Sequence, residues 1–223
     1  MRDGQYRPEF FQLGSIAALQ LWGSQATPLE LKVKRGMDLL ASSVLLVLLA
    51  PLLTLIAIAI RLDSQGPVVF RQRRYGLGGE SFDCLKFRTM RVQENAEVVE
   101  QAKRNDPRVT RLGRWLRSWN LDELPQLLNV WRGEMSLVGP RPHAAAHNEF
   151  YRTRVRGYMR RHALRPGLTG WAQVMGLRGR TETVDRMEAR VSADLDYIQN
   201  WSLRLDLKIL ILTLVRWRNE HAY

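Results

Sequence analysis

Two adjacent carboxylates, Asp122 and Glu123, precede an apolar run at residues 124–131 whose spacing predicts a short helix. Aspartate suits the N-cap of such a helix, and glutamate suits its first turn. Pro125 is tolerated there because the first helical N–H groups have no intrahelical partner. Two interpretations are open. The pair is a capping signature, or it is a site where a carboxylate meets phosphate and a divalent cation at the positive end of a helix.

The rest of the chain supplies many cations for such an anionic ligand. Its 223 residues include 34 Lys and Arg against 22 Asp and Glu, which gives a net charge of +12. This excess indicates an anionic partner: a phosphorylated substrate, anionic lipid or nucleic acid. A hydrophobic content of 45% excludes a disordered chain, and the length suits one large domain with or without an appendage. Cys84 is the only cysteine, so an internal disulfide is excluded.

Arg141 stands between two prolines, which stiffen its backbone and favour bidentate recognition of a phosphate. A basic block follows at residues 152–165 and is expected to face a membrane surface or a nucleotide, with solvated charge as the alternative. His143 and His147 are four residues apart, a spacing similar to that of metal ligands, and Glu149 is nearby. No third ligand is clearly placed, so a transition-metal site is the less favoured interpretation.

A β-hairpin is predicted from two segments with strand character, residues 66–75 and 80–88, joined by a glycine-rich turn at residues 76–79. A phosphate-binding loop is the other interpretation of these glycines, but no helix start follows them. Lys86 and Arg88 end the second strand, where either side chain can point at an anion. Plain surface charge is the alternative for both.

A basic amphipathic helix is predicted over residues 106–119, with Asp106 as its N-cap and Pro107 at its first position. Arginines recur at every third position up to Arg117, and leucine and tryptophan occupy the other face. This pattern is typical of a helix that lies in the plane of the lipid headgroups. A core helix with a solvated arginine face is the alternative.

Residues 39–60 carry no charge and are long and apolar enough to cross a bilayer. Pro51 is expected to kink this helix, and positive residues on both flanks draw both ends to the same side. A re-entrant helix–break–helix satisfies both features, and a kinked transmembrane helix is the alternative. Lys34 and Arg35 are placed to meet lipid phosphates or to act as a topology signal. Asp38 is expected to pair with Arg35 or with an arginine from elsewhere in the chain.

Three further segments have weaker signals. Residues 1–30 carry no secretory signal, and their apolar residues predict a short amphipathic helix in a variable appendage. Residues 92–104 predict a polar helix. Residues 203–217 are strongly apolar but interrupted by charges, which predicts a buried or interface-lying helix and not a membrane span.

Several strings in a fixed order make the chain resemble the bacterial sugar transferases, the monotopic phosphoglycosyl transferases that begin surface-glycan assembly. The resemblance covers residues 32–218. Each string alone has little specificity, whereas the ordered set is highly specific. The strings are GPVVF (66–70) with Gln72 and Arg73, KFRTM (86–90), DPR (106–108), LDELPQ (121–126), MSLVGPRP (135–142), RPGLTG (165–170), and Asp194 with Tyr197.

The resemblance implies an α+β, mostly helical fold: a re-entrant membrane helix, a cytoplasmic catalytic domain with a small β-hairpin, and amphipathic helices at the membrane surface. The expected divisions are an appendage (1–31), the membrane helix (32–62) and the catalytic domain (63–223). The implied reaction transfers a sugar 1-phosphate from a nucleotide diphosphate sugar, usually UDP-linked, to a polyprenyl phosphate and requires Mg²⁺. It would start exopolysaccharide, capsule or O-antigen-type synthesis at the cytoplasmic face of a bacterial inner membrane.

The resemblance also implies roles for single residues. Asp122 is expected to attack the sugar-bearing phosphate and to carry it covalently. Glu123 is expected to serve magnesium or proton handling, and both carboxylates are expected to contact the metal. Arg141 is expected at the nucleotide site. The remaining expected contacts are Lys86, Arg88 and Arg117 with phosphate, and Lys34, Arg35, Asp38 and Pro51 with lipid.

The chain departs from the family at two positions. Ala50 stands before Pro51 where many members have serine, which puts the angle of the helix break in question. Met175 stands before Gly176 where many members have asparagine, which puts the sugar or nucleotide contacts in question.

A non-catalytic basic scaffold that binds anionic lipid or nucleic acid is the alternative function. The intact pair of Asp122 and Glu123 argues against it, because carboxylates repel such ligands. We expect a UDP-sugar donor, a polyprenyl phosphate acceptor and inner-membrane lipid as partners, and no nucleic acid. The identity of the sugar, the glycan pathway and a homodimeric state stay open.

Overall fold

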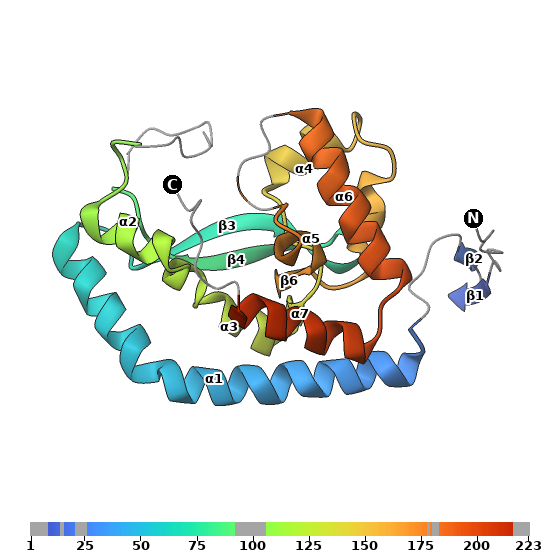
Figure 1. Cartoon of the computed structure of the whole chain (residues 1–223), viewed down its shortest axis with the longest axis horizontal. Helices are drawn as coiled ribbons and strands as arrows, with labels where there is room; N and C mark the ends of the chain where they lie inside the picture. The colour runs from blue at the N-terminus through green and yellow to red at the C-terminus, as the bar shows by residue number, and fades with distance from the viewer. Residues whose placement is uncertain are drawn as a thin grey trace.

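The computed structural model describes residues 9–13, 16–20, 26–91, 106–177, 179 and 183–215. Helices predominate over small sheets, which confirms the predicted α+β class (Figure 1). The polar helix predicted at residues 92–104 lies outside the described residues. The elements are β1 (Glu9–Leu13), β2 (Ile16–Gln20), α1 (Pro28–Asp63), β3 (Val69–Tyr75), η1 (Leu77–Gly79), β4 (Ser81–Phe87), α2 (Arg111–Ser118), η2 (Leu121–Glu123), α3 (Gln126–Arg132), β5 (Ser136–Val138), α4 (Ala145–Tyr151), η3 (Tyr158–Ala163), β6 (Gly167–Thr169), α5 (Trp171–Val174), α6 (Val184–Gln199) and α7 (Leu203–Val215), where η marks a 3₁₀ turn.

The predicted hairpin is confirmed as β3 and β4. They pair antiparallel, from Val69 opposite Phe87 to Tyr75 opposite Ser81. The glycine-rich turn between them contains η1, where Gly78 adopts a φ of 66°, a left-handed conformation that glycine reaches without steric cost. The plain-turn interpretation of these glycines therefore fits the backbone.

A second pairing joins segments far apart in the sequence. β5 and β6 run parallel, with Ser136 opposite Gly167 and Val138 opposite Thr169. A Cβ on Gly167 would stand 2.1 Å from the backbone nitrogen of Gly139, so no larger residue fits at this approach. The parallel pair therefore brings the Gly-Pro-Arg-Pro string after β5 against the Arg-Pro-Gly string before β6.

The short amphipathic helix predicted near the N-terminus is wrong. Residues 9–13 and 16–20 form β1 and β2, two antiparallel strands with Glu9 opposite Gln20 and Leu13 opposite Ile16. The prediction read the apolar residues as a helical stripe. Gly14 and Ser15 are turn-forming residues between two short runs that contain apolar residues, and this pattern indicates a hairpin.

The apolar segment lies within α1, a single helix assigned from Pro28 to Asp63. It begins with a capping box, in which the Thr27 hydroxyl accepts from the Glu30 N–H and the Glu30 carboxylate accepts from the Thr27 N–H. Pro51 is inside the helix, and Figure 1 shows that α1 bends in its second half. An interior proline removes one helical hydrogen bond, which accounts for a bend without an interruption.

Most of the apolar surface of α1 is uncovered by the rest of the chain. Only 11% of its most apolar stretch is buried, and its length and composition suffice to cross a membrane. Leu40, Val47, Leu48 and Leu62 are each more than two-thirds exposed. So large an apolar surface on a helix is typical of contact with lipid or with another protein.

A buried ion pair fastens the N-terminal part of α1 to α7. Lys34 Nζ lies 2.5 Å from Asp206 Oδ2 and donates to the carbonyl of Val138 at 2.9 Å. The Tyr197 hydroxyl donates to the other carboxylate oxygen of Asp206 at 2.7 Å. Because Lys34 is only 7% exposed and its ammonium is committed to these partners, the prediction that it meets a lipid phosphate is wrong.

Replacing Lys34 by methionine is expected to lower the free energy of unfolding by about 3–5 kcal/mol, because the Asp206 carboxylate then stays buried without its cation. The paired replacement Lys34→Met with Asp206→Leu should recover part of that loss, since it leaves no uncompensated charge. Urea unfolding in detergent micelles measures both values. Equal losses in the single and the paired variant would contradict the assignment.

Arg35 and Asp38 also have partners other than those predicted. The Arg35 guanidinium donates to the carbonyls of Val130 and Trp131 at 2.6 and 2.7 Å, where α3 ends. Asp38 accepts from the backbone N–H of Leu137 at 3.0 Å. The predicted Asp38–Arg35 pair is therefore wrong: both side chains satisfy backbone groups that lie about 100 residues away in the sequence.

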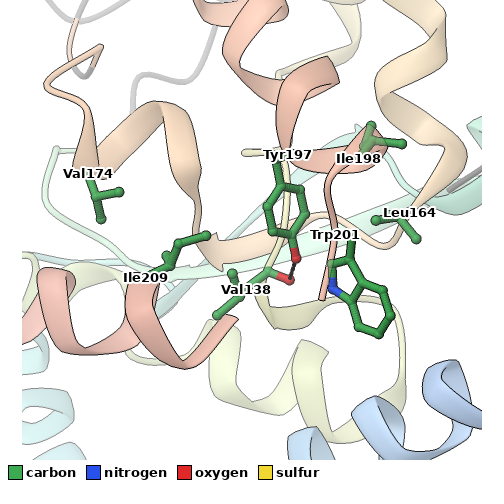
Figure 2. Packing of buried hydrophobic residues seen from close by; sticks show 7 residues of the cluster. All are labelled: Val138, Leu164, Val174, Tyr197, Ile198, Trp201 and Ile209. Carbon is green, nitrogen blue, oxygen red and sulfur yellow. Dashed lines mark hydrogen bonds between the residues drawn. The ribbon is translucent and has the colours of Figure 1, made fainter. Parts of the chain in front are cut away.

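Two packed clusters support these contacts. One joins β5 to the C-terminal helices around Tyr197 and Ile209, and Figure 2 shows the Tyr197 hydroxyl directed at the Val138 carbonyl. The other packs Ile56 and Ile60 of α1 against Leu116 of α2 and their neighbours. The apolar helix therefore contacts the rest of the chain near both of its ends.

Candidate active site

Asp122 and Glu123 lie in η2, the turn between α2 and α3. Asn120 opens this turn with a φ of 54°, a left-handed conformation that asparagine adopts more readily than most residues. The predicted helix does follow as α3, but it begins at Gln126 with Pro125 as its N-cap. The prediction of Asp122 as N-cap is therefore wrong, and its carboxylate is not used to cap the helix.

The Glu123 carboxylate binds two cationic side chains. Lys86 Nζ from β4 lies 2.7 Å from Oε1. Arg141 donates from Nη1 to Oε2 at 3.0 Å and from Nη2 to Oε1, so the guanidinium grips both oxygens. Lys86 and Arg141 thus lie beside the acidic pair, and in this structure their direct partner is Glu123.

The two carboxylates have opposite electrostatic settings. Burial raises the pKa of Glu123, but the Arg141 and Lys86 cations outweigh it and hold this pKa well below its usual range. Burial raises the pKa of Asp122 to about 6, with Glu123 adding to the rise and Lys86 opposing it. Glu123 is therefore a fixed anion, whereas Asp122 titrates near neutral pH.

Asp122 keeps its carboxylate oxygens uncommitted. It is 9% exposed, and across the described ranges no hydrogen bond or ion pair reaches its side chain. Lys86, Arg117 and Arg141 are each close enough to lower its pKa. A carboxylate with free oxygens amid three cations is suited to meet a phosphate.

The pKa of Asp122 sets an expected pH dependence. If the reaction needs the ionised carboxylate, then kcat/KM should fall below about pH 6, by about tenfold for each further pH unit, because the acid form cannot attack. Initial rates measured from about pH 5 to 8 at limiting donor give the profile. A rate that stays flat across pH 6 would contradict the need for an ionised Asp122.

Of the other two residues predicted to contact phosphate, Arg117 lies at the site and Arg88 does not. Arg117 donates from Nε to the Thr89 hydroxyl at 2.8 Å and lies near Asp122, so it belongs to the site. Arg88 is 6% exposed and donates to the carbonyls of Pro67 and Ser64 at 2.6 Å each. Arg88 thus joins the end of α1 to the start of β3, and its predicted phosphate contact is wrong.

α2, which carries Arg117, starts later than predicted. Its first residue is Arg111 and its N-cap is Thr110, whose hydroxyl accepts from the Gly113 N–H. Asp106 instead pairs with Arg108 two residues on, at 2.7 Å. The Asp-Pro signature marks the turn before the helix, which a cap-first interpretation cannot distinguish from the helix start itself.

The histidine metal site, the less favoured interpretation of this segment, is not assembled among the described residues. His143 is 7% exposed and its Nδ1 meets the Tyr158 hydroxyl at 2.6 Å and Arg161 Nη1 at 2.5 Å. Glu149 instead pairs with Arg152 at the surface. In the residues that the structure describes, no group of three His, Cys, Asp or Glu is placed to hold a metal ion.

The arginines of the basic block at residues 152–165 occupy both surface and interior positions. Arg161 is 2% exposed and forms an ion pair with Asp194 at 2.5 Å, which the sequence analysis did not anticipate. Arg165 donates to the carbonyl of Gly133 at 2.9 Å. Nothing in the spacing of the arginines marks Arg161 as interior. A carboxylate at an apolar-flanked position such as Asp194 is the signal that could have indicated a buried partner.

Known proteins are similar to this chain in sequence. The profile of the family described as bacterial sugar transferase matches residues 29–220. Over 213 residues the chain is 48% identical to a UDP-glucose:undecaprenyl-phosphate glucose-1-phosphate transferase of Escherichia coli K12, covering 95% of this chain and 46% of that protein. A transferase of the same description from Caulobacter vibrioides is 59% identical over 180 residues, covering 81% and 67%.

A third relative differs in its sugar. A UDP-N-acetylgalactosamine-undecaprenyl-phosphate N-acetylgalactosaminephosphotransferase of Aeromonas hydrophila is 40% identical over 195 residues, covering 87% of this chain and 46% of that protein. The chain thus spans less than half the length of the Escherichia coli and Aeromonas relatives.

Proposed function

The chain belongs to the bacterial sugar transferase family, and from this premise we propose that it transfers a sugar 1-phosphate from a UDP-sugar to undecaprenyl phosphate. The names of the relatives support this donor and this acceptor class. The observation in the structure that carries the proposal is the uncommitted carboxylate of Asp122 beside Glu123, Lys86 and Arg141. A basic scaffold would not need a carboxylate at the centre of its cations.

The proposed reaction has two displacements at one phosphorus atom. An Asp122 oxygen attacks the sugar-bearing phosphorus of the donor, the bond to the bridging oxygen breaks, and UMP leaves. The sugar phosphate is then held on Asp122 as an acyl phosphate. A phosphate oxygen of the polyprenyl acceptor attacks the same phosphorus and frees the carboxylate. One site can thus serve a soluble donor and a lipid acceptor in turn.

The surrounding charges support this chemistry. A carboxylate and a diphosphate repel one another, and the cations of Lys86, Arg117 and Arg141 offset that repulsion around Asp122. Glu123 holds two of these cations in place through three hydrogen bonds. Glu123 therefore acts in the proposal mainly as the fixed counter-ion that organises the donors.

The same oxygens are suited to a divalent cation. Mg²⁺ prefers one or two carboxylates together with substrate phosphates and water. Asp122 offers free oxygens, and Glu123 Oε2 accepts one hydrogen bond where Oε1 accepts two. We propose that these two residues hold Mg²⁺ against the donor diphosphate. The ion would supply charge neutralisation of the phosphates and of the leaving UMP.

The proposed membrane placement rests on α1. Its exposed apolar surface, the bend in its second half (Figure 1), the interior Pro51 and the positive residues on both flanks support a re-entrant helix in the inner leaflet of the bacterial inner membrane. The catalytic domain would then lie on the cytoplasmic face. At that depth Asp122 can reach both a soluble donor and a lipid-linked phosphate.

Single cysteines at Lys32 and Asp63, placed in a Cys84→Ser background, are expected to label from the same, cytoplasmic side of sealed membrane vesicles. Both residues are exposed ends of α1 and the native thiol is buried, so the background signal should be low. Labelling from opposite sides would identify α1 as a spanning helix and would refute the re-entrant proposal.

A radiolabelled transfer assay tests the proposed activity directly. The purified chain is incubated with Mg²⁺, undecaprenyl phosphate and a panel of UDP-sugars that begins with UDP-glucose and UDP-N-acetylgalactosamine, the donors named for the relatives. We expect labelled lipid product with at least one donor, and label on the protein when the acceptor is omitted. No transfer with any donor would contradict the proposal.

A further inference from the structure

The backbone that carries Arg141 is held at three consecutive carbonyls. In residues 140–142 the first carbonyl accepts from the Gly167 N–H at 2.9 Å, the second from Arg161 Nη2 at 2.7 Å, and the third from Arg74 Nη1. Prolines at both ends lack an N–H, so carbonyls are the main groups by which this segment can be fixed.

Arg161 is the donor with the most firmly fixed surroundings. It donates to Asp194 Oδ2 from Nε at 3.1 Å and from Nη2 at 2.5 Å. Both side chains are 2% exposed. Asp194 lies on α6, an element separate in sequence from the η3 turn that carries Arg161. A buried guanidinium with a buried carboxylate partner has little freedom to leave the Arg141 carbonyl.

His143 adds a third constraint on Arg161. A guanidinium can only donate, so the 2.5 Å contact requires His143 Nδ1 to act as the acceptor. The imidazole is then neutral with its proton on Nε2. Burial, with Arg161 and Arg190 nearby, holds the pKa of His143 well below its usual range, which agrees with this state. This contact is a further bond that holds the Arg161 guanidinium in place.

Arg74 differs from Arg161 in its partners. Its other hydrogen bonds go to Gln72 on its own strand, at 2.8 and 3.3 Å. It contacts the carbonyl of Pro142, one residue beyond Arg141. Arg161 alone among the donors to residues 140–142 contacts the Arg141 carbonyl itself.

We infer that Arg161, anchored by Asp194, is a positioning residue for the active site: it fixes the Arg141 backbone so that the Arg141 guanidinium reaches both oxygens of Glu123. The inference rests on the proposed function. It assigns to the Arg161–Asp194 pair a role in turnover that a plain core ion pair would not have. Arg161 touches neither Asp122 nor Glu123, so it acts through Arg141.

A mutant cycle separates positioning from simple support of the fold. The paired replacement Arg161→Met with Asp194→Leu removes the bond to the Arg141 carbonyl without leaving a buried charge. It is made in the wild-type chain and again with Arg141→Met. Single-turnover transfer to the lipid acceptor is measured for each folded preparation. Arg165→Met is the matched control, because this arginine also donates to a backbone carbonyl, that of Gly133.

The paired replacement is expected to slow transfer by about 10²-fold, because small displacements of a charged group at an active site have effects of that size. Together with Arg141→Met it should cause no further loss, since the group it positions is already absent. Arg165→Met should stay near the wild-type rate in both backgrounds. Losses that multiply across the cycle, or no loss from the paired replacement, would overturn the inference.

If the paired replacement does not fold, the conservative variant Arg161→Lys takes its place in the mutant cycle. Lysine retains the charge opposite Asp194 but lacks the planar fork, so about a tenfold loss is expected, again absent with Arg141→Met. Failure of the proposed function would show as no lipid product from the wild-type chain. Failure of this inference would show only among the variants.

Discussion

Replacing Asp122 by asparagine is expected to reduce sugar-phosphate transfer by about 10⁴-fold or more, because the attacking group of a covalent mechanism is lost. The amide is nearly the same size as the carboxylate, and no described residue hydrogen-bonds to the Asp122 side chain. The change should therefore leave the fold intact. Measurement uses labelled donor and lipid acceptor, together with the label retained on the protein when acceptor is omitted.

The control for this experiment is Asp196→Asn, a neutralised aspartate that is exposed on α6 and away from the acidic pair. Its rate, and the membrane association of both variants, should match those of the wild-type chain. A purified Asp122→Asn preparation that still turns over near the wild-type rate would exclude this aspartate as the nucleophile.

Replacing Glu123 by glutamine is expected to slow transfer by about 10²–10³-fold, the effect of losing the group that organises a preformed set of donors. The carboxylate accepts both arms of Arg141 and the ammonium of Lys86. An amide turns its NH₂ group toward one of these cations, so the bidentate contact cannot form. In the wild-type chain Glu123 raises the pKa of Asp122. Its replacement should therefore lower that pKa, because the nearby cations then act without an opposing carboxylate.

The two readouts for Glu123→Gln are the rate and the acidic limb of the pH profile. The limb should move to lower pH while the maximum rate falls, a combination that partial unfolding does not produce. Glu149→Gln, which alters an exposed pair with Arg152, should change neither. A rate near that of the wild-type chain would show that Glu123 does not organise the site.

Local patterns predicted the elements of this chain better than their partners. Alternation and glycines located the hairpin, and the uncharged run located the apolar helix, because both signals are contained in neighbouring residues. Asp122, Glu123 and Arg141 were chosen from residue type and an ordered resemblance, and the structure brings them together. Lys34 pairs with Asp206, 172 positions away, and no local pattern predicted this pairing.

Three misassigned arginines share a physical cause. Arg35, Arg88 and Arg161 were each interpreted as cations for an external anion or solvent, yet all three donate to backbone carbonyls. A guanidinium has five donors in a fixed fork, which suits unpaired carbonyls at the ends of helices and strands as well as it suits phosphate. Charge composition alone cannot separate these uses, because the carbonyls become available only once the chain has folded.

The contact of Arg35 with the end of α3 couples the position of α1 to that of the acidic pair. α3 begins three residues after Glu123 and ends where Arg35 binds its last carbonyls, a span of about 10 Å at the rise of an α-helix. A short helix therefore connects α1 to the turn that carries Asp122. If α1 lies in the bilayer as proposed, any tilt or sinking of α1 in a thicker or thinner bilayer would carry Asp122 with it, and bilayer thickness would then set how readily the lipid phosphate is met.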